Sequence, residues 1–90
     1  MADIRWSREA LADLIAQTDE LESQNPQAAR RLLQDVQRLA DHLAQFPALG
    51  RAIDGTGLRV LLTRSYRYRL VYRVAGDAVE VIAVLHPRQA

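Results

Sequence analysis

The sequence contains neither cysteine nor lysine among its 90 residues. Without cysteine, the chain can form neither a disulfide framework nor a thiolate metal site. The longest uninterrupted apolar run, "VIAVL" at residues 81–85, is far too short to cross a bilayer. The opening "MADIRWSREA" lacks the cationic segment and the apolar run of a secretory signal. We therefore expect a cytoplasmic protein that does not enter a membrane.

Several enzyme classes are excluded because their motifs are missing. The sequence has no glycine-rich phosphate loop, no cluster of metal ligands and no pairing of a nucleophile with a base. We therefore expect no cofactor and no bound metal. A stand-alone nucleic-acid-binding protein would carry a larger basic excess than the formal net charge of +1. Direct sequence-specific binding of nucleic acid is therefore not expected.

The cations that are present are all arginine, and they are unevenly distributed. Residues 1–48 contain 5 arginines and 8 acidic residues, whereas residues 49–90 contain 7 arginines and 3 acidic residues. An arginine side chain binds carboxylates and phosphates through two parallel hydrogen bonds, which the point charge of lysine does not provide. The basic second half of the chain therefore predicts an anionic partner.

The first half of the chain predicts a strand followed by two helices. Apolar and polar residues alternate in "ADIRW" at residues 2–6, which is typical of a half-buried strand. Ser7 is a suitable N-cap for a helix that continues to about Glu22. Asn25 and Pro26 provide the cap and the first position of a second helix, of roughly 20 residues, which ends at "FPALG". The short connection predicts an antiparallel helix hairpin.

The second half predicts a loop and three strands. Residues 46–57 contain one proline and three glycines and are expected to form a surface loop. "GLRVLLT" at 57–63 and "RSYRYRLVYRV" at 64–74 alternate as strands do. "AVEVIAVL" at 78–85 is apolar on both faces, which predicts a strand inside the sheet. Residues 1–90 are thus expected to form one α+β domain, in the order β-α-α-β-β-β, with the helix hairpin on one sheet face.

The alternation within residues 64–74 separates tyrosines from arginines. The side expected to meet the helices carries Tyr66, Tyr68, Leu70, Tyr72 and Val74. The opposite side, which a single helix hairpin cannot cover, carries Arg67, Arg69 and Arg73. These arginines form either a solvated face, whose stems lie on apolar surface, or a recognition surface. Arg59 on the neighbouring strand and Arg88 in the tail favour recognition.

The last five residues, "HPRQA" at 86–90, follow the final predicted strand. Because Pro87 cannot donate a hydrogen bond to a sheet ladder, these residues are expected to contribute little to the core. They are either a frayed chain end or an extension of the arginine face. In the second case His86 and Arg88 join the arginines of residues 64–73 in one patch.

Five short motifs, in this order, resemble the ParE branch of the RelE/ParE toxin superfamily. They are "WSREALADL", "NPQAARRL", "FPALGR", "YRLVYRV" and "VLHPR", and together they cover almost the whole chain. The resemblance implies the toxin of a bacterial type II toxin–antitoxin pair, a class that acts in plasmid or chromosome stabilisation. It implies a helix hairpin on a small antiparallel-rich sheet. It also implies a cognate ParD-like antitoxin as partner and DNA gyrase as the target, whose inhibition blocks replication.

The superfamily contains a second activity, because RelE-like members cut mRNA on the ribosome without a metal. Such cleavage needs a proton acceptor, a donor for the leaving oxygen and cations for the crowded charge. The sequence offers many cations but only two histidines. We therefore favour a gyrase inhibitor without catalysis of its own. The alternative is a ribosome-dependent mRNA endonuclease with His86, Arg88 and Arg69 as its catalytic set.

Two sets of candidate binding residues follow from these interpretations. For the target we expect a surface made of Arg64, Arg67, Arg69, Arg73, His86 and Arg88. For the antitoxin we expect apolar anchors on the flank of the hairpin and on the sheet. The antitoxin's carboxylates are expected to meet Arg59, Arg67 and Arg69.

Overall fold

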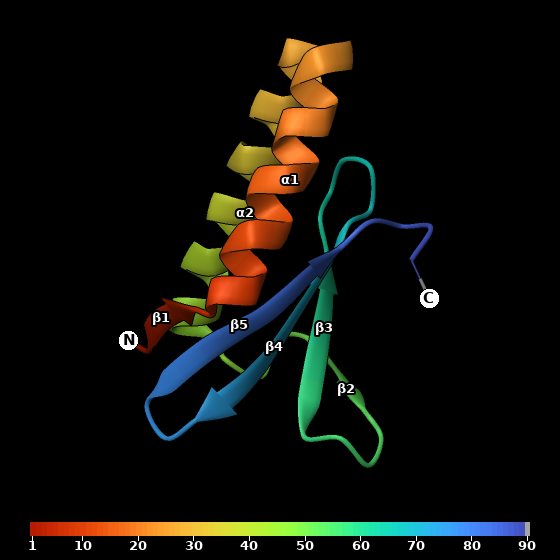
Figure 1. Cartoon of the computed structure of the whole chain (residues 1–90). Helices are drawn as coiled ribbons and strands as arrows, with labels where there is room; N and C mark the ends of the chain where they lie inside the picture. The colour runs from red at the N-terminus through yellow and green to blue at the C-terminus, as the bar shows by residue number, and fades with distance from the viewer. Residues whose placement is uncertain (90) are drawn as a thin grey trace.

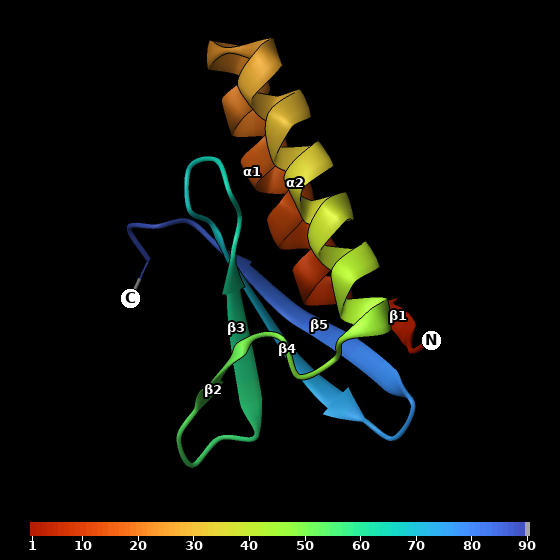
Figure 2. The same cartoon turned by 180° about the vertical axis from the view of Figure 1, so that it is seen from behind.

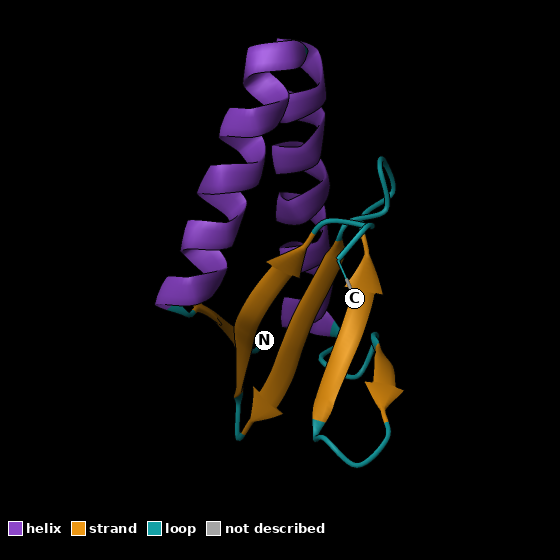
Figure 3. Ribbon diagram, turned by 45° about the vertical axis from the view of Figure 1, so that its right-hand side comes forward, coloured by secondary structure: helices purple, strands orange, loops and turns teal. Residues whose placement is uncertain are grey.

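The computed structural model describes residues 1–89 as two helices packed on one face of a five-stranded sheet (Figure 1). In chain order the elements are β1 (Asp3–Trp6), α1 (Arg8–Gln24), α2 (Pro26–Gln45), β2 (Arg51–Ile53), β3 (Leu58–Leu62), β4 (Arg69–Ala75) and β5 (Ala78–Leu85). Figure 3 shows the hairpin and the sheet as two layers. Within the described residues, no helix is long and apolar enough to span a membrane. The predicted α+β class and the helix hairpin are confirmed.

The five strands have the order β1-β5-β4-β3-β2. β1 pairs with β5 in parallel, and the other neighbouring pairs are antiparallel. β5 therefore lies inside the sheet, as its apolar faces predict, between β1 and β4 (Figure 2). The register shifts between Val71 and Tyr72, which leaves Ile82 as an extra residue in β5. This bulge lets Val81 and Val84, three residues apart, both be buried.

Capping side chains set the boundaries of the helices. The Ser7 hydroxyl accepts a hydrogen bond from the N–H of Ala10 at 3.0 Å, as expected for the N-cap of α1. The side-chain oxygen of Asn25 accepts from the N–H groups of Gln27 at 3.1 Å and Ala28 at 3.3 Å. Asn25 is also the C-cap of α1. A single residue therefore joins the two helices, and they run antiparallel as predicted.

The core lies between the hairpin and the helix-facing side of the sheet. α2 contributes most of the helical part through Leu32, Val36 and Leu43, whereas α1 fully buries only Ala10. Ile15, which belongs to the predicted apolar stripe of α1, is 58% exposed. The buried residues of the core cluster that follow β3 are Tyr68, Leu70, Tyr72, Val79, Val81 and Val84.

The predicted loop at residues 46–57 contains a short strand, β2. Its residues pair antiparallel with β3, from Arg51 opposite Val60 to Ile53 opposite Leu58. All three residues of β2 are exposed, so no alternation of buried and exposed positions marked the strand in the sequence. The chain therefore has one strand more than predicted.

The strand predicted at residues 64–74 begins only at Arg69. Residues 64–67 form a turn instead, in which φ is +64° at Tyr66 and +55° at Arg67. These values lie outside the extended region of the backbone, so side chains no longer alternate between the two faces there. The prediction that one continuous strand carries all eleven residues is wrong.

The turn changes which residues of this segment reach the core. Tyr68 and Tyr72 are buried, as predicted. Tyr66 is 42% exposed, because it lies in the turn rather than on the core-facing side of a strand. Val74 is also exposed, because it lies near the end of β4 while α1 packs against β5. The prediction of a core position is therefore wrong for Tyr66 and Val74.

Candidate functional site

The two faces of the sheet divide the arginines differently from the prediction. Residues directly opposite each other on neighbouring strands project to the same side. Arg69 is opposite Leu62 and Leu85, whereas Arg59 is opposite the buried Tyr72. Because Arg69 and Tyr72 are three positions apart in β4, they project to opposite sides. Arg59 thus lies on the helix-facing side and Arg69 on the uncovered face, so the structure does not bring them together.

Arg59 and Tyr72 hold the segment that connects α2 to β2. Arg59 Nη1 donates to the carbonyl oxygens of Gly50 at 2.7 Å and Ala48 at 3.3 Å. The Tyr72 hydroxyl donates to the carbonyl of Pro47 at 2.8 Å and accepts from the N–H of Gly50 at 2.7 Å. A Cβ on Gly50 would lie 2.7 Å from Tyr72 Cε1, so glycine is required for this close approach. The guanidinium of Arg59 therefore has a structural role.

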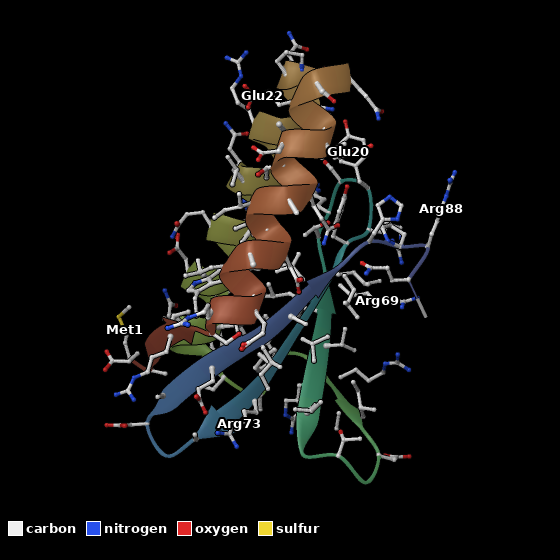
Figure 4. All side chains as sticks on the ribbon, in the orientation of Figure 1. Met1, Glu20, Glu22, Arg69, Arg73 and Arg88 are labelled. Carbon is white, nitrogen blue, oxygen red and sulfur yellow. The ribbon has the colours of Figure 1, made fainter. Side chains whose placement is uncertain are left out.

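Arg73 lies apart from the other candidate arginines. It is near the end of β4 that is remote from the C-terminal tail (Figure 4). Its Nη2 is 2.6 Å from Oε1 of Glu80, its cross-strand neighbour. At the rise of a strand, Arg73 is roughly 13 Å along β4 from Arg69. The predicted single face through Arg67, Arg69 and Arg73 is wrong, because Arg67 lies in the turn and Arg73 is distant and paired.

Residues 86–89 form a hydrogen-bonded turn after β5. The N–H of Gln89 donates to the carbonyl of His86 at 2.9 Å, and the N–H of Arg88 donates to His86 Nδ1 at 3.0 Å. Arg69 Nη1 donates to the carbonyl of Gln89 at 2.6 Å, which ties this turn to β4. The structure therefore brings Arg69, His86 and Arg88 together. Residues 86–89 are held by specific contacts rather than frayed.

The tail and the turn at residues 64–67 leave the sheet at the same end (Figure 1). The His86 ring meets the Tyr68 ring edge to face, with centroids 5.3 Å apart. Arg88 extends outward from the body of the molecule (Figure 4). Ala90, the last residue of the predicted tail, lies outside the described residues. A cationic and aromatic surface thus occupies this end of the sheet.

A groove of about 580 Å³ separates this surface from α1. The tail side is lined by Tyr68, His86 and Arg88, and the α1 side by Asp13, Gln17 and Glu20. The α1 residues were missed in the sequence, although their spacing places them on one helix face. Asp13 Oδ2 accepts the N–H of Val84 at 3.0 Å, and Gln17 Nε2 donates to the carbonyl of Val84. Among residues 1–89, no three His, Asp or Glu side chains gather as metal ligands would.

Two buried tyrosine hydroxyls near this end resist ionisation. Burial raises the pKa of Tyr68 above its ordinary value of 10.0. Burial also raises the pKa of Tyr72, although the hydrogen bond from Gly50 and the charge of Arg59 act in the opposite direction. Above pH 10.0 the unfolded chain loses these protons while the folded chain keeps them.

The free energy of unfolding is therefore expected to be independent of these two groups below pH 10.0 and to fall as the pH rises through their raised pKa values. Urea denaturation at about pH 8 and about pH 11 measures the loss. The variant Tyr68→Phe should lose less stability over the same interval than the parent protein. An identical loss in both proteins would contradict the contribution of Tyr68.

Comparison with known proteins gives one family for the whole chain. The family model of the ParE toxin of the type II toxin–antitoxin system parDE matches residues 4–90. The chain is 34% identical over 86 residues to toxin RelE2 of Caulobacter vibrioides, with 96% of each chain covered. It is also 34% identical over 86 residues to the putative toxin Y4kP of Sinorhizobium fredii, with 96% of this chain and 88% of that one covered.

The fold is also found in solved structures of toxin–antitoxin systems. A chain of the chromosomal ParDE system from P. aeruginosa superposes with a TM-score of 0.80, at 25% identity and with 96% of each chain covered. A chain of the intact RelBE toxin–antitoxin complex of E. coli superposes with a TM-score of 0.68, at 18% identity, with 99% of this chain and 100% of that one covered. The second likeness, at this identity, concerns the fold alone.

Proposed function

The chain belongs to the ParE toxin family and is the toxin of a type II toxin–antitoxin system, and we propose that it blocks DNA replication by inhibiting DNA gyrase. The observation that carries this proposal is the chemistry of the turn at residues 86–89. Two guanidiniums, of Arg69 and Arg88, lie beside one imidazole, His86, whose Nδ1 already accepts a hydrogen bond. Such a surface suits binding, whereas phosphodiester cleavage needs two proton carriers. Gyrase as the target places the toxin in the cytoplasm.

The proposed target surface lies where the tail and the turn at residues 64–67 leave the sheet. It consists of Arg64, Arg67, Arg69, His86 and Arg88. Three of these residues are exposed and two are half-buried, so their charges are available to a partner. Arg73 is omitted, because it lies at the other end of β4 and pairs with Glu80.

Ribosome-dependent cleavage of mRNA is the second candidate, favoured by the closeness of His86, Arg88 and Arg69. In that reaction His86 Nε2 would take the proton of a 2′-hydroxyl as it attacks the adjacent phosphate. The two guanidiniums would stabilise the charge on the phosphate oxygens. The leaving oxygen would still need a proton donor, and the nearest ring, Tyr68, is buried.

Expression of the toxin without its antitoxin separates the two candidates in living cells. If gyrase is the target, incorporation of labelled thymidine stops before incorporation of labelled methionine. If the ribosome is the target, methionine incorporation stops first, and the proposal is contradicted. Co-expression of the antitoxin is the control and should restore both.

The antitoxin is the second partner, and both solved structures come from toxin–antitoxin systems. A ParD-like antitoxin is proposed to lay apolar anchors on the uncovered face of the sheet. A groove of about 570 Å³ lies there between Arg51 and Arg69, with the exposed Leu62 in its lining. The carboxylates of the antitoxin are proposed to meet Arg67 and Arg69. Arg59, which the sequence placed with them, is committed to backbone carbonyls.

Charge reversal at these two arginines, R67E with R69E, is expected to weaken antitoxin binding at least about tenfold, because paired charges become repulsive. Added salt should weaken binding of the parent toxin more than binding of the variant, since it screens the same charges. Isothermal titration calorimetry measures both effects. Arg8→Glu, at an exposed position in α1, is the matched control. An affinity indifferent to the double reversal would contradict this placement.

A further inference from the structure

The turn between β3 and β4 places two consecutive bulky residues in a backbone conformation that glycine ordinarily occupies. φ is +64° at Tyr66 and +55° at Arg67. In this left-handed region the Cβ approaches the following carbonyl oxygen, so side chains of this size are uncommon there. Asparagine and glycine tolerate such backbone. The chain therefore uses Tyr and Arg at positions where neither is favourable for stability.

Buried neighbours hold the turn in this conformation. The N–H of Thr63 donates to the carbonyl of Tyr68 at 2.9 Å, and the N–H of Tyr68 donates to the Thr63 hydroxyl at 2.9 Å. The same hydroxyl donates to the carbonyl of Ser65 at 2.6 Å. From α2, the carboxylate of Asp35 accepts the N–H of Ser65 at 2.7 Å. Because Thr63 and Asp35 are buried, the surrounding structure imposes the strained backbone.

The strained turn presents its side chains to solvent. Tyr66 is 42% exposed, and both Arg64 and Arg67 are exposed. The turn rises beyond the end of the sheet in Figures 1 and 2. Among residues 1–89 the ion pair is that of Arg73 with Glu80, so neither arginine of the turn has a carboxylate partner. The strain thus positions side chains that contribute little to the core, which is typical of a functional element.

The chemistry of the turn fits an acidic protein surface better than a nucleic acid. Unpaired guanidiniums suit carboxylates and phosphates alike. Capture of a phosphate backbone depends on many cations acting together, and the chain has a formal net charge of only +1. A tyrosine beside arginines is the typical composition of a protein-binding hot spot, where an aromatic ring is surrounded by polar contacts.

We propose that the turn at residues 64–67 is a preorganised recognition element that docks an acidic surface of the toxin's protein target, and that its strain lowers the stability of the toxin. This inference rests on the proposed function, because it takes the target to be a protein. It adds Tyr66 to the target surface and explains why Asp35 is buried beneath the turn.

A pair of variants at residue 67 tests the strain. Arg67→Gly and Arg67→Ala remove the same guanidinium, but only alanine keeps a Cβ at φ +55°. The glycine variant is expected to melt about 4–8 °C above the alanine variant, as for relief of a backbone penalty in a domain of this size. Tyr66→Asn should also raise the melting temperature. Equal melting of the two residue-67 variants would overturn the claim of strain.

Growth arrest by the full chain, expressed without antitoxin, tests recognition. Arg67→Gly, Arg67→Ala and Tyr66→Asn should each need at least about tenfold more toxin for the same arrest, the loss expected when a hot-spot side chain is removed. Arg8→Ala, at the start of α1, is the matched control and should arrest growth as the parent does. A glycine variant that is more stable and arrests growth fully would overturn the recognition role.

Supercoiling by purified gyrase separates failure of this inference from failure of the proposed function. If the parent and the turn variants inhibit gyrase equally, the inference fails and the proposed function stands. If the parent does not inhibit gyrase, the proposed function fails, and the growth and melting comparisons still judge the turn. Tight binding of a fluorescent single-stranded RNA that Arg67→Ala weakens tenfold would overturn the assignment to a protein partner.

Discussion

Replacing Tyr72 with alanine is expected to lower the free energy of unfolding by about 3–5 kcal/mol. The side chain is fully buried at 0% exposure in the centre of the core. Its hydroxyl bonds both the carbonyl of Pro47 and the N–H of Gly50, so removal also leaves these two backbone groups unpaired. A small domain has a total stability of about 5–15 kcal/mol. Urea denaturation should therefore show a partly unfolded population even without denaturant.

Tyr72→Phe is the matched control, because it keeps the ring and removes only the hydroxyl. The loss should be about 1–3 kcal/mol, the cost of leaving polar groups unpaired. Thermal protection of the segment between α2 and β2 should fall in both variants when amide exchange is measured. A phenylalanine variant as stable as the parent would contradict the anchoring role given to the hydroxyl.

Removing residues 86–90 is expected to weaken growth arrest at least about tenfold while the protein stays folded. The deleted segment supplies His86 and Arg88 to the proposed target surface, and it follows the last residue of β5. Arg69 loses its contact with the carbonyl of Gln89, which lies outside the core. The melting temperature should therefore change little. Plating efficiency and thermal melting measure the two effects.

Arg88→Ala tests the same surface with a single exposed side chain. It should reproduce much of the loss of growth arrest, because no side-chain contact of Arg88 holds the tail turn, which uses its N–H. A truncated protein that melts like the parent and still arrests growth fully would contradict the role of the tail. Unfolding of the truncated protein would assign the tail a structural role instead.

The elements that were predictable from the sequence are those with a sustained period and a capping signal. α2 buries Leu32, Val36 and Leu43 at helical spacing, and its N-cap Asn25 precedes a proline. β5 is apolar on both faces and lies inside the sheet. In both cases the local pattern and the tertiary environment require the same residues, so periodicity was sufficient.

The elements that were not predictable depend on distant contacts. β2 exists because β3 offers it a hydrogen-bonding edge, and its own residues carry no pattern. The turn at residues 64–67 continues the tyrosine and arginine alternation of the strand after it. Thr63 and Asp35 override that alternation through hydrogen bonds across the fold. A local period cannot reveal a backbone that is set by a residue about thirty positions away.

The candidate site shows the same division. The sequence identified His86 and Arg88 near Arg69, because a tail after a central strand lies beside its neighbour. It did not reveal that the Gln89 carbonyl makes the connection to Arg69, since side-chain to backbone contacts leave no periodic signal. It also grouped Arg59 with Arg69, although the register of β3 against β4 places them on opposite faces.

The proposed target is tested most directly by purified toxin in two assays run in parallel. One assay follows the supercoiling of relaxed plasmid by DNA gyrase, and the other follows mRNA on translating ribosomes. The proposal predicts that the toxin stops supercoiling and leaves the mRNA intact, and that addition of the antitoxin restores supercoiling. Site-specific cuts in the mRNA with unaffected supercoiling would contradict it and assign the His86, Arg88 and Arg69 cluster to ribonuclease chemistry.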